Sequence, residues 1–476
     1  MIENFKIKVS SLFNTRQGRF FSLVIVFLFL VSITITLAPT AQSKSFYTSL
    51  NWAQWIGFFV WLGSFGILIT YTENRGIQTN QLLIPLAAFI SGWGLLTIWR
   101  LSTPLGAKQT LWLAISIAAV IVGLKYQQQF LRILRTHKYF WLFTGLAITT
   151  LTLLFGTNPN GEGPNLWLGC CGIYLQPSEP LKLLLILYLA AYFADRQPFS
   201  SSLISTIAPT LVMAGMALLI LVVQRDLGTA SIFIFIYASM IYIATGKKRL
   251  LLFSLLIIAV ASLMGYFLFD VVQIRFEAWI NPWLDPSGRS YQIVQSLMSI
   301  AAGGMTGRGP GMGYPNLVPI AFSDFIYAGI AEEYGLPGTL ALVIAIMLFI
   351  FQSYQIGLKA NNRYHRYLSI GLATYIASQS ILIIGGNIRL LPLTGVTLPF
   401  FSYGGSSLLT TFIAFLLILA INHQEQGTST LKANPTPVFH IAGLLLAGFL
   451  AIGLLTSWWS LWRGPDLLTR TDNARR

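Results

Sequence analysis

The stretch NPWLDPSGRSYQ at residues 281–292 holds a single carboxylate, Asp285, between two prolines. Pro282 and Pro286 each fix a backbone torsion and restrict the residue before them, so Asp285 belongs to a stiffened segment. A carboxylate held in this way can serve chemistry, but an aspartate in an LDPSG sequence is also an ordinary turn residue. Local sequence alone favours the turn, so the choice depends on what surrounds the segment.

A second pair of chemically capable residues lies at the start of an apolar run. In QPSEPLKLLLIL, Glu179 and Lys182 are three residues apart, which places them on one face of a helix. A charge at membrane depth costs several kcal/mol unless it is paired or hydrated. The two residues could form a self-neutralising pair that locks neighbouring helices, or the polar wall of an outward-facing cavity.

Two more motifs carry charge where apolar runs end. QRDLGTA at 224–230 places Arg225 and Asp226 at a tight turn between two spans, which could be a satisfied turn or part of a site. In SDFIYAGIAEE, Ser323 is expected to be the N-cap of a helix with Asp324 in its first turn. Capping is sufficient to explain these two residues.

A third motif, LPLTGVTLPFFSYGGSS at 391–407, is rich in Pro and Gly beside a span. Irregular backbone at membrane depth is tolerated where it lines protein or a water-filled cavity. We therefore expect a re-entrant wall that includes Ser402 and Ser406, with simple helix capping as the alternative.

The elements that position these residues follow from composition. Of the 476 residues, 55% are hydrophobic and only 9% are charged, and the mean hydropathy is +0.69. Apolar runs of about 20 residues, the length that crosses the hydrocarbon core as a helix, recur from end to end. No soluble globular domain has this composition, and the alternating strands of an outer-membrane barrel are absent from the sequence. The sequence predicts an all-α, polytopic transmembrane protein.

The apolar runs define thirteen candidate spans. They cover approximately residues 20–38, 52–71, 81–99, 110–124, 139–156, 177–193, 203–223, 227–245, 250–270, 325–353, 368–385, 403–422 and 438–458. Between two of them, YQIVQSLMSIAAGG at 291–304 has the spacing of a short amphipathic helix, which we expect to lie in the membrane interface.

The net charge of +15 could indicate a nucleic-acid partner, but the basic residues are scattered between the apolar runs. Topology explains them better, because cytoplasmic loops collect Lys and Arg. We therefore expect no nucleic acid and a cytoplasmic N-terminus. This orientation puts three segments on the outer face, 157–176, 271–324 and 386–402, and these segments contain or adjoin most of the motifs above.

Taken together, the motifs resemble those of the SEDS family (shape, elongation, division and sporulation), the RodA, FtsW and SpoVE-like peptidoglycan glycosyltransferases. Five pieces match in the family's order: QPSEPLK at 176–182, QRDLGTA at 224–230, WINPWLDPSGRSYQIVQS at 279–296, GRGPGMGYPNLVPIAFSDFIYAGIAEEYGLPG at 307–338 and PLTGVTLPFFSYGGSS at 392–407. The chain departs from the family pattern at Leu166, before Trp167, where a basic residue is common, and at Arg225, where many members have Pro.

The resemblance covers roughly residues 81–423 and implies a core of ten transmembrane helices with a large outer loop at 271–324. On this view residues 1–80 are an N-terminal extension with two transmembrane helices. Residues 424–476 are a C-terminal extension with one transmembrane helix and an outer tail.

By this likeness, the chain polymerises lipid II into glycan strands at the outer face of the cytoplasmic (inner) membrane, for cell elongation or division. A sugar hydroxyl attacks an anomeric carbon whose leaving group is undecaprenyl pyrophosphate. The alcohol is a poor nucleophile at neutral pH, so a carboxylate general base is the natural device, and Asp285 matches the family's catalytic aspartate. The resemblance implies substrate contacts at Trp167, Glu179, Lys182, Arg225, Asp226, Tyr291, Gln292, Asp324, Ser402 and Ser406.

The leaving pyrophosphate requires a fixed cation nearby. The candidates, among which spacing cannot choose, are Arg100, Lys182, Arg225, Arg275 and Arg389. A divalent cation, Mg or Mn, could share this task, although no protein cage for one is visible in the sequence, so no metal ligand is assigned. The resemblance also implies a class B penicillin-binding protein as partner.

Two other classes of function fit the hydropathy. A flippase for lipid-linked precursors predicts an inward-opening polar cavity and paired repeat halves. No convincing internal repeat is present, and the polar motifs favour one face. A non-catalytic scaffold of the cell-wall machinery would keep the motifs without the activity, and an intact Asp285 argues against it.

Overall fold

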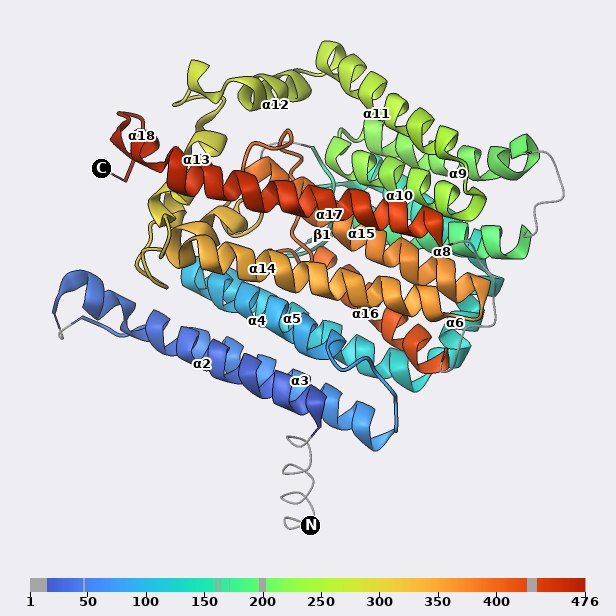
Figure 1. The fold of residues 1–476 in the computed structure, drawn as a ribbon, viewed down its shortest axis with the longest axis horizontal. Coiled ribbons are helices and arrows are strands. Elements are labelled where there is room, and N and C mark those ends of the chain that lie inside the picture. The colour runs from blue at the N-terminus through green and yellow to red at the C-terminus, as the bar shows by residue number, and fades with distance from the viewer. Residues whose placement is uncertain are drawn as a thin grey trace.

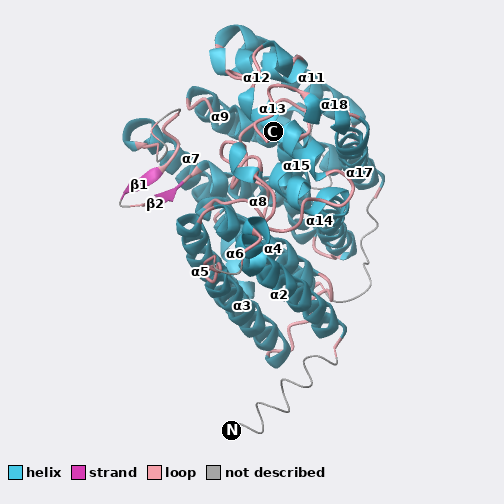
Figure 2. Cartoon of the chain, turned by 90° about the vertical axis from the view of Figure 1, so that its left-hand side faces the viewer, coloured by secondary structure: helices cyan, strands magenta, loops and turns pink. Residues whose placement is uncertain are grey.

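The computed structural model describes residues 15–45, 48–158, 161, 164–170, 172–196, 203–425 and 435–475. The described chain is a bundle of long helices (Figure 1), and the all-α prediction is confirmed. Within the described ranges, the named strands form one antiparallel hairpin, β1 (Leu168–Cys170) with β2 (Ile173–Leu175). This hairpin projects from the side of the bundle in Figure 2.

A helix is found at each of the predicted spans. In chain order these helices are α2 (Arg16–Ser43), α3 (Gln54–Asn74), α4 (Leu83–Leu101), α5 (Thr103–Lys125), α7 (Lys138–Phe155), α8 (Ser178–Arg196), α9 (Leu203–Val223), α10 (Leu227–Thr245), α11 (Lys248–Leu268), α14 (Ile326–Lys359), α15 (Arg363–Asn387), α16 (Gly405–Gln424) and α17 (Thr436–Ser457). By length and composition, 10 helices of the described ranges can cross a membrane, α17 being counted through Trp462. The others at predicted spans are α8, α9 and α11, and α9 contains a shorter apolar segment, Ile207–Val223.

The spanning helices differ in how much of their surface other helices cover. Helices α15 and α4 are the most deeply buried, whereas α2, α7 and α17 leave most of their surface uncovered. The uncovered side chains include many Leu, Ile, Val and Phe residues. Because hydrocarbon accepts such side chains without cost, this surface suits a bilayer and explains why the helices are apolar on all sides.

The shorter elements are α6 (Gln127–Thr136), α12 (Asp270–Ile280), the 3₁₀ turns η1 (Pro282–Leu284) and η2 (Pro315–Leu317), α13 (Tyr291–Gly303), the π-turn η3 (Trp458–Trp462) and α18 (Gly464–Thr469). The helix expected at 291–304 is therefore present as α13. It does not lie exposed on the bundle as an amphipathic interfacial helix would, because residues 293–301 are all buried and α13 contacts α14, α15 and α18.

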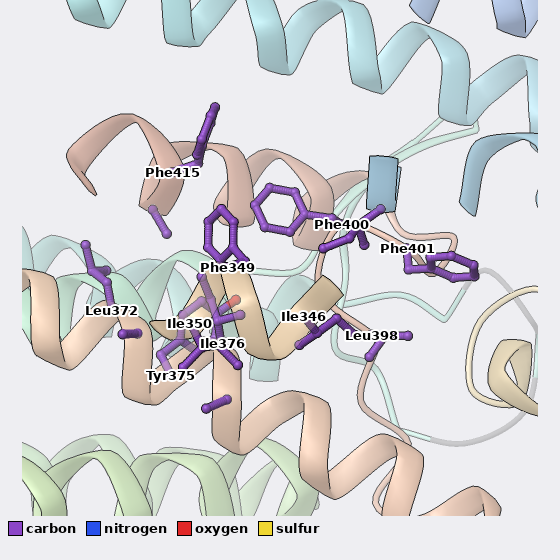
Figure 3. Close-up of a cluster of buried hydrophobic side chains, with 14 of the residues drawn as sticks. Ile346, Phe349, Ile350, Leu372, Tyr375, Ile376, Leu398, Phe400, Phe401 and Phe415 are labelled. Atoms are coloured by element: carbon purple, nitrogen blue, oxygen red, sulfur yellow. The ribbon is translucent and has the colours of Figure 1, made fainter. Parts of the chain in front are cut away.

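Residues 388–404, between α15 and α16, form irregular backbone that is packed into the core. Figure 3 shows Leu398, Phe400 and Phe401 among side chains of α14, α15 and α16. The Phe400 ring centroid lies 5.2 Å from that of Phe349 and 5.2 Å from that of Phe412. The segment thus lines protein, as expected of a wall at membrane depth.

The helices at the two ends of the chain pack on different sides of the bundle. Helices α2 and α3 lie along α4 and α5, and α17 runs along α14 and α15 (Figure 1). Beyond α17 the chain reaches α13 through η3 and α18. The C-terminal segment is therefore brought next to the loop that contains Asp285.

Candidate functional site

The three segments predicted to share one face meet at one end of the bundle. The Ser406 hydroxyl accepts a hydrogen bond from the Gln176 backbone N–H at 2.9 Å. The Ser402 hydroxyl donates to the Ser323 carbonyl at 2.7 Å. Residues far apart in the sequence are thus joined at the ends of α8, α14 and α16, and Ser402 and Ser406 both serve as ties between segments.

The Asp285 loop runs from η1 to α13 and is mostly exposed. At its start the Asn281 side chain accepts a hydrogen bond from the Trp283 N–H at 3.3 Å. The Asp285 Oδ2 atom accepts from the Arg289 N–H at 2.9 Å. Oδ2 is therefore fixed in a local turn. Oδ1 of this exposed side chain accepts no hydrogen bond from the residues that the structure describes, which leaves it open to act as a general base.

Gly288 sits directly against the Asp285 carboxylate. A Cβ atom at this position would lie 2.4 Å from Asp285 Oδ2 and 2.6 Å from Oδ1. The constraint is one of space, because both carboxylate oxygens occupy the volume that a side chain would need. The close approach of the Asp285 carboxylate thus explains why a glycine is found at position 288.

We expect Gly288→Ala to displace the carboxylate and lower the turnover number. A misplacement of about 1 Å at a reacting group can cost on the order of 100-fold in rate. The loop is exposed, so the midpoint of thermal unfolding should stay close to that of the wild type. Turnover of the purified variant, measured beside its unfolding curve, checks both expectations, and undiminished turnover would contradict the close approach.

The Glu179–Lys182 pair is built into the protein interior. Lys182 Nζ lies 2.8 Å from Glu179 Oε1 and donates to Gln379 Oε1 at 2.8 Å, and the Lys182 side chain is completely buried. Gln379 in turn donates to the Thr397 carbonyl at 2.8 Å. The pair thereby ties α8 to α15 and to the 388–404 segment, which is the geometry of the locking pair considered from the sequence.

The turn at 224–226 separates its two charged residues. Asp226 is the N-cap of α10: its carboxylate accepts from the Thr229 N–H at 3.2 Å and from the Ser178 hydroxyl at 3.0 Å. Arg225 has a left-handed backbone, with φ of 60°, and an exposed side chain. The Asp226 carboxylate therefore has hydrogen-bond donors from the helix it caps and from Ser178, whereas the Arg225 side chain is exposed.

Asp324 lies beside Arg275, which donates to the Thr394 carbonyl at 3.3 Å. Both side chains border Gly395, where a Cβ would lie 3.4 Å from the Arg275 guanidinium and 3.5 Å from Asp324 Oδ2. Desolvation raises the pKa of Asp324, against the opposing effects of the Ser323 hydrogen bond and of Arg275. Desolvation likewise lowers the pKa of Arg275, which Asp324 partly offsets.

The expected cap at Ser323 is wrong. Helix α14 begins at Ile326, its N-cap is Phe325, and the Ser323 hydroxyl donates to Asp324 Oδ1 at 3.0 Å. The chain from 319 to 325 forms turns rather than helix, so the side-chain oxygens of Ser323 and Asp324 bond locally instead of to a first helical turn.

The other predicted contact residues are more peripheral. Trp167 pairs through its backbone with Thr157, whose N–H donates to the Trp167 carbonyl at 2.8 Å. Tyr291 and Gln292 begin α13 and are half-buried, and the Tyr291 hydroxyl donates to the Leu317 carbonyl at 3.4 Å. Over the described ranges, no hydrogen bond or ion pair joins Asp285 to the Glu179–Lys182 pair or to Asp324.

Four of the five candidate cations are engaged by the protein itself. Arg100 lies 3.4 Å from Glu333, and Arg389 donates to the Trp279 carbonyl at 2.7 Å. Lys182 and Arg275 have the partners given above. Among these five, Arg225 has an exposed side chain and no hydrogen-bond or ion-pair partner within the ranges that the structure describes.

Arg289 is a residue that sequence reasoning missed. Its backbone N–H donates to Asp285, and its side chain is 65% exposed, with a long 3.9 Å contact between its guanidinium and the Glu277 carboxylate. The signal available in the sequence was its position four residues after Asp285, within the same motif. An exposed cation therefore lies in the same loop as the candidate base.

In the part of the chain that the structure describes, no group of three or more His, Cys, Asp or Glu side chains could hold a metal ion. Asp285 is a single carboxylate in an exposed loop, and the residues present do not form a cage for Mg or Mn. We assign no step to a metal.

The fold and the site define a class: a polytopic, predominantly helical membrane protein with its polar motifs gathered at one end. Residues 81–427 match the FtsW/RodA/SpoVE family, described as "Cell cycle protein". The match covers well over half of the chain, and the chain belongs to this family. The resemblance drawn from the motifs is confirmed.

Similar proteins carry names from this family. "Peptidoglycan glycosyltransferase RodA" of Mycobacterium tuberculosis (strain ATCC 25618 / H37Rv) is 32% identical over 386 residues, which cover 76% of this chain and 81% of the relative. "Probable peptidoglycan glycosyltransferase FtsW" of Geobacter metallireducens is 30% identical over 375 residues, covering 77% of this chain and 93% of the relative.

Solved structures share the fold. One is described as "Structural coordination of polymerization and crosslinking by a peptidoglycan synthase complex"; its matching chain is 25% identical, with a TM-score of 0.62 and coverage of 74% of this chain and 99% of that one. The rod shape determining protein RodA of Thermus thermophilus gives a TM-score of 0.57 at 21% identity, with the same coverage. The latter likeness concerns the fold alone.

Proposed function

We propose that this chain, a peptidoglycan glycosyltransferase by its family and its named relatives, polymerises lipid II into glycan strands at the outer face of the cytoplasmic membrane. The observation that carries the proposal is the Asp285 carboxylate. It is exposed, held through Oδ2 by the Arg289 N–H at 2.9 Å, and available at Oδ1. The proposed orientation, with a cytoplasmic N-terminus, rests on the distribution of Lys and Arg.

In the proposed step, Asp285 accepts the proton of the attacking sugar hydroxyl. The hydroxyl oxygen bonds to the anomeric carbon of the second lipid-linked sugar. The bond from that carbon to the undecaprenyl pyrophosphate oxygen breaks, and the pyrophosphate leaves with the electron pair. A positioned general base contributes roughly 100-fold or more to such a step.

Arg225 is our candidate for a contact to the leaving pyrophosphate, because its side chain is exposed and has no hydrogen-bond or ion-pair partner in the described part of the chain. Arg225→Ala is expected to lower polymerisation on the order of 100-fold, the cost of losing one donor that stabilises developing charge. Arg225→Lys should retain part of the activity, since it keeps the charge but not the forked geometry. Lys125→Ala, at the far end of α5, serves as the control in the same rate assay; equal rates for Arg225→Ala and wild type would remove Arg225 from the site.

The remaining contacts stay predictions at Trp167, Tyr291, Gln292, Asp324, Ser402 and Ser406. For Glu179, Lys182 and Asp226, we propose a supporting role, because their carboxylate and ammonium groups are buried and paired within the protein. They would hold α8, α10 and the 388–404 segment in place around the substrate.

A class B penicillin-binding protein is the proposed partner. The similar solved chain comes from a peptidoglycan synthase complex whose description joins polymerisation to crosslinking. In such a complex this chain would supply the polymerising activity and the partner the crosslinking activity.

Reconstitution tests the function. The purified chain is incubated with purified lipid II, with and without the partner, and glycan strands are resolved by electrophoresis. Polymer is the expected product. Translocation of a labelled precursor across vesicles without polymer would favour the flippase, and neither product would favour the scaffold.

A further inference from the structure

The C-terminal segment at 458–475, which we call the C-terminal clamp, lies beyond the family match that ends at 427. It consists of η3, α18 and the residues that follow, and it packs on α13, the helix that begins where the Asp285 loop ends. Figure 1 shows α18 and the C-terminus beside α13. Leu467 of α18 is 1% exposed, so one side of the clamp is buried against the rest of the protein.

One contact reaches the loop before Asp285. The Arg470 guanidinium lies over the Trp283 ring, 4.1 Å from its centroid. Trp283 is two residues before Asp285 and belongs to the 3₁₀ turn η1. A cation over an indole face is the strongest arrangement of this kind among aromatic side chains. Arg470 thus holds the entry to the loop.

A second contact fixes the helix after the loop. Arg475 donates to both carboxylate oxygens of Glu332, each at 3.0 Å, and both side chains are completely buried. The same guanidinium donates to Gln295 Oε1 at 2.9 Å and to the Ser299 hydroxyl at 3.2 Å, on α13. A forked, charge-assisted contact of this kind is geometrically specific, and it joins α13 to α14 through the C-terminal tail.

Two further hydrogen bonds join the clamp to residues that contact the elements before and after the Asp285 loop. The Trp459 indole N–H donates to the Ile388 carbonyl at 2.8 Å, next to Arg389, which holds the end of α12 through the Trp279 carbonyl. The Ser460 hydroxyl donates to the Gly304 carbonyl at 2.8 Å, at the end of α13. The C-terminal clamp therefore contacts both η1, which precedes Asp285, and α13, which follows the loop.

We propose that the C-terminal clamp positions the Asp285 loop for catalysis, with Arg470 and Arg475 as positioning residues. The inference rests on the proposed role of Asp285 as general base. Within the described ranges, the carboxylate itself is held by one hydrogen bond, from the Arg289 N–H. Its placement therefore depends on what holds Trp283 on one side and α13 on the other, and the clamp contacts both.

The test uses two variants of the full-length chain that remove the contacts without leaving a lone buried charge. Arg470→Ala removes the cation over Trp283. Glu332→Gln combined with Arg475→Met removes both charges of the buried pair, since removing one alone would leave an uncompensated charge. Arg463→Ala is the matched control, because its ion pair with Asp466, at 3.2 Å, stays within α18 and its cap.

Two readouts are measured on each purified variant: hydrogen exchange of the backbone amides at 283–290, and polymerisation kinetics with lipid II. We expect both variants to speed the exchange of the Arg289 amide and to lower kcat by about tenfold to 100-fold with little change in KM. Arg470→Lys should restore part of both readouts, and Arg463→Ala should leave both at the wild-type value.

Wild-type exchange and wild-type kcat in Arg470→Ala would overturn the proposal, and so would a change in only one of the two readouts. The outcome for the proposed function is separate. If Asp285→Asn keeps its activity, the catalytic role of Asp285 fails whatever the exchange shows. If Asp285→Asn is inactive and the clamp variants behave as wild type, the clamp alone fails.

Discussion

Asp285→Asn is expected to lower lipid II polymerisation by at least on the order of 100-fold, the contribution of a positioned general base. Asparagine has nearly the same shape and its side-chain oxygen can still accept the Arg289 N–H, so the loop should keep its conformation. The amide cannot take up the proton of the attacking hydroxyl. The loss should therefore fall on the rate, which a time course of glycan formation measures.

Glu277→Gln is the matched control for this prediction. Glu277 lies on α12, eight residues before Asp285, and its exposed carboxylate contacts Gln273 at 2.9 Å. If Asp285 mattered only as a negative charge at this end of the protein, the two substitutions would have similar effects. We expect Glu277→Gln to polymerise lipid II at close to the wild-type rate, and similar losses in both variants would argue against the general base.

Lys182→Met is expected to destabilise the protein by about 3–5 kcal/mol, because it leaves the Glu179 carboxylate buried without its counter-ion. Lys182 is completely buried, and Glu179 Oε2 already has no hydrogen-bond partner among the described residues. The variant also loses the donor to Gln379, which ties α15 to the 388–404 segment. Thermal or denaturant unfolding of the purified protein in detergent measures the change in the free energy of unfolding.

The double variant Glu179→Leu, Lys182→Met separates the cost of the lone charge from the cost of losing the pair. Replacing both partners of a buried ion pair by apolar side chains is often neutral or stabilising. We therefore expect the double variant to recover most of the loss. A single variant as stable as the wild type would show that the pair does not lock α8 to α15.

The positions of the long helices could be predicted from the sequence, because insertion into a membrane depends on the hydrophobicity of each segment, and the residue types give that hydrophobicity directly. Each predicted span contains a helix, since runs of Leu, Ile, Val and Phe near 20 residues long have few alternatives in a bilayer. The motif residues at 176, 323, 402 and 406 were also predicted to lie on one face, and hydrogen bonds join them there.

The tertiary contacts that hold the candidate site in place could not be predicted from the sequence. Arg475 and Glu332 are 143 residues apart, and only tertiary packing brings them together. The spacing of α13 indicated a helix with an apolar face but could not tell that α14, α15 and α18 cover it. Ser323 had the residue type of an N-cap, yet the turns before Ile326 direct its hydroxyl to Asp324.

A single-turnover experiment tests the catalytic role of Asp285 most directly. Labelled lipid II is bound to excess wild type or Asp285→Asn, and both the affinity and the rate of the first glycosidic bond are followed. We predict equal affinity and a rate of bond formation reduced on the order of 100-fold or more in the variant. Bond formation by Asp285→Asn at the wild-type rate would contradict the role of Asp285 as the general base.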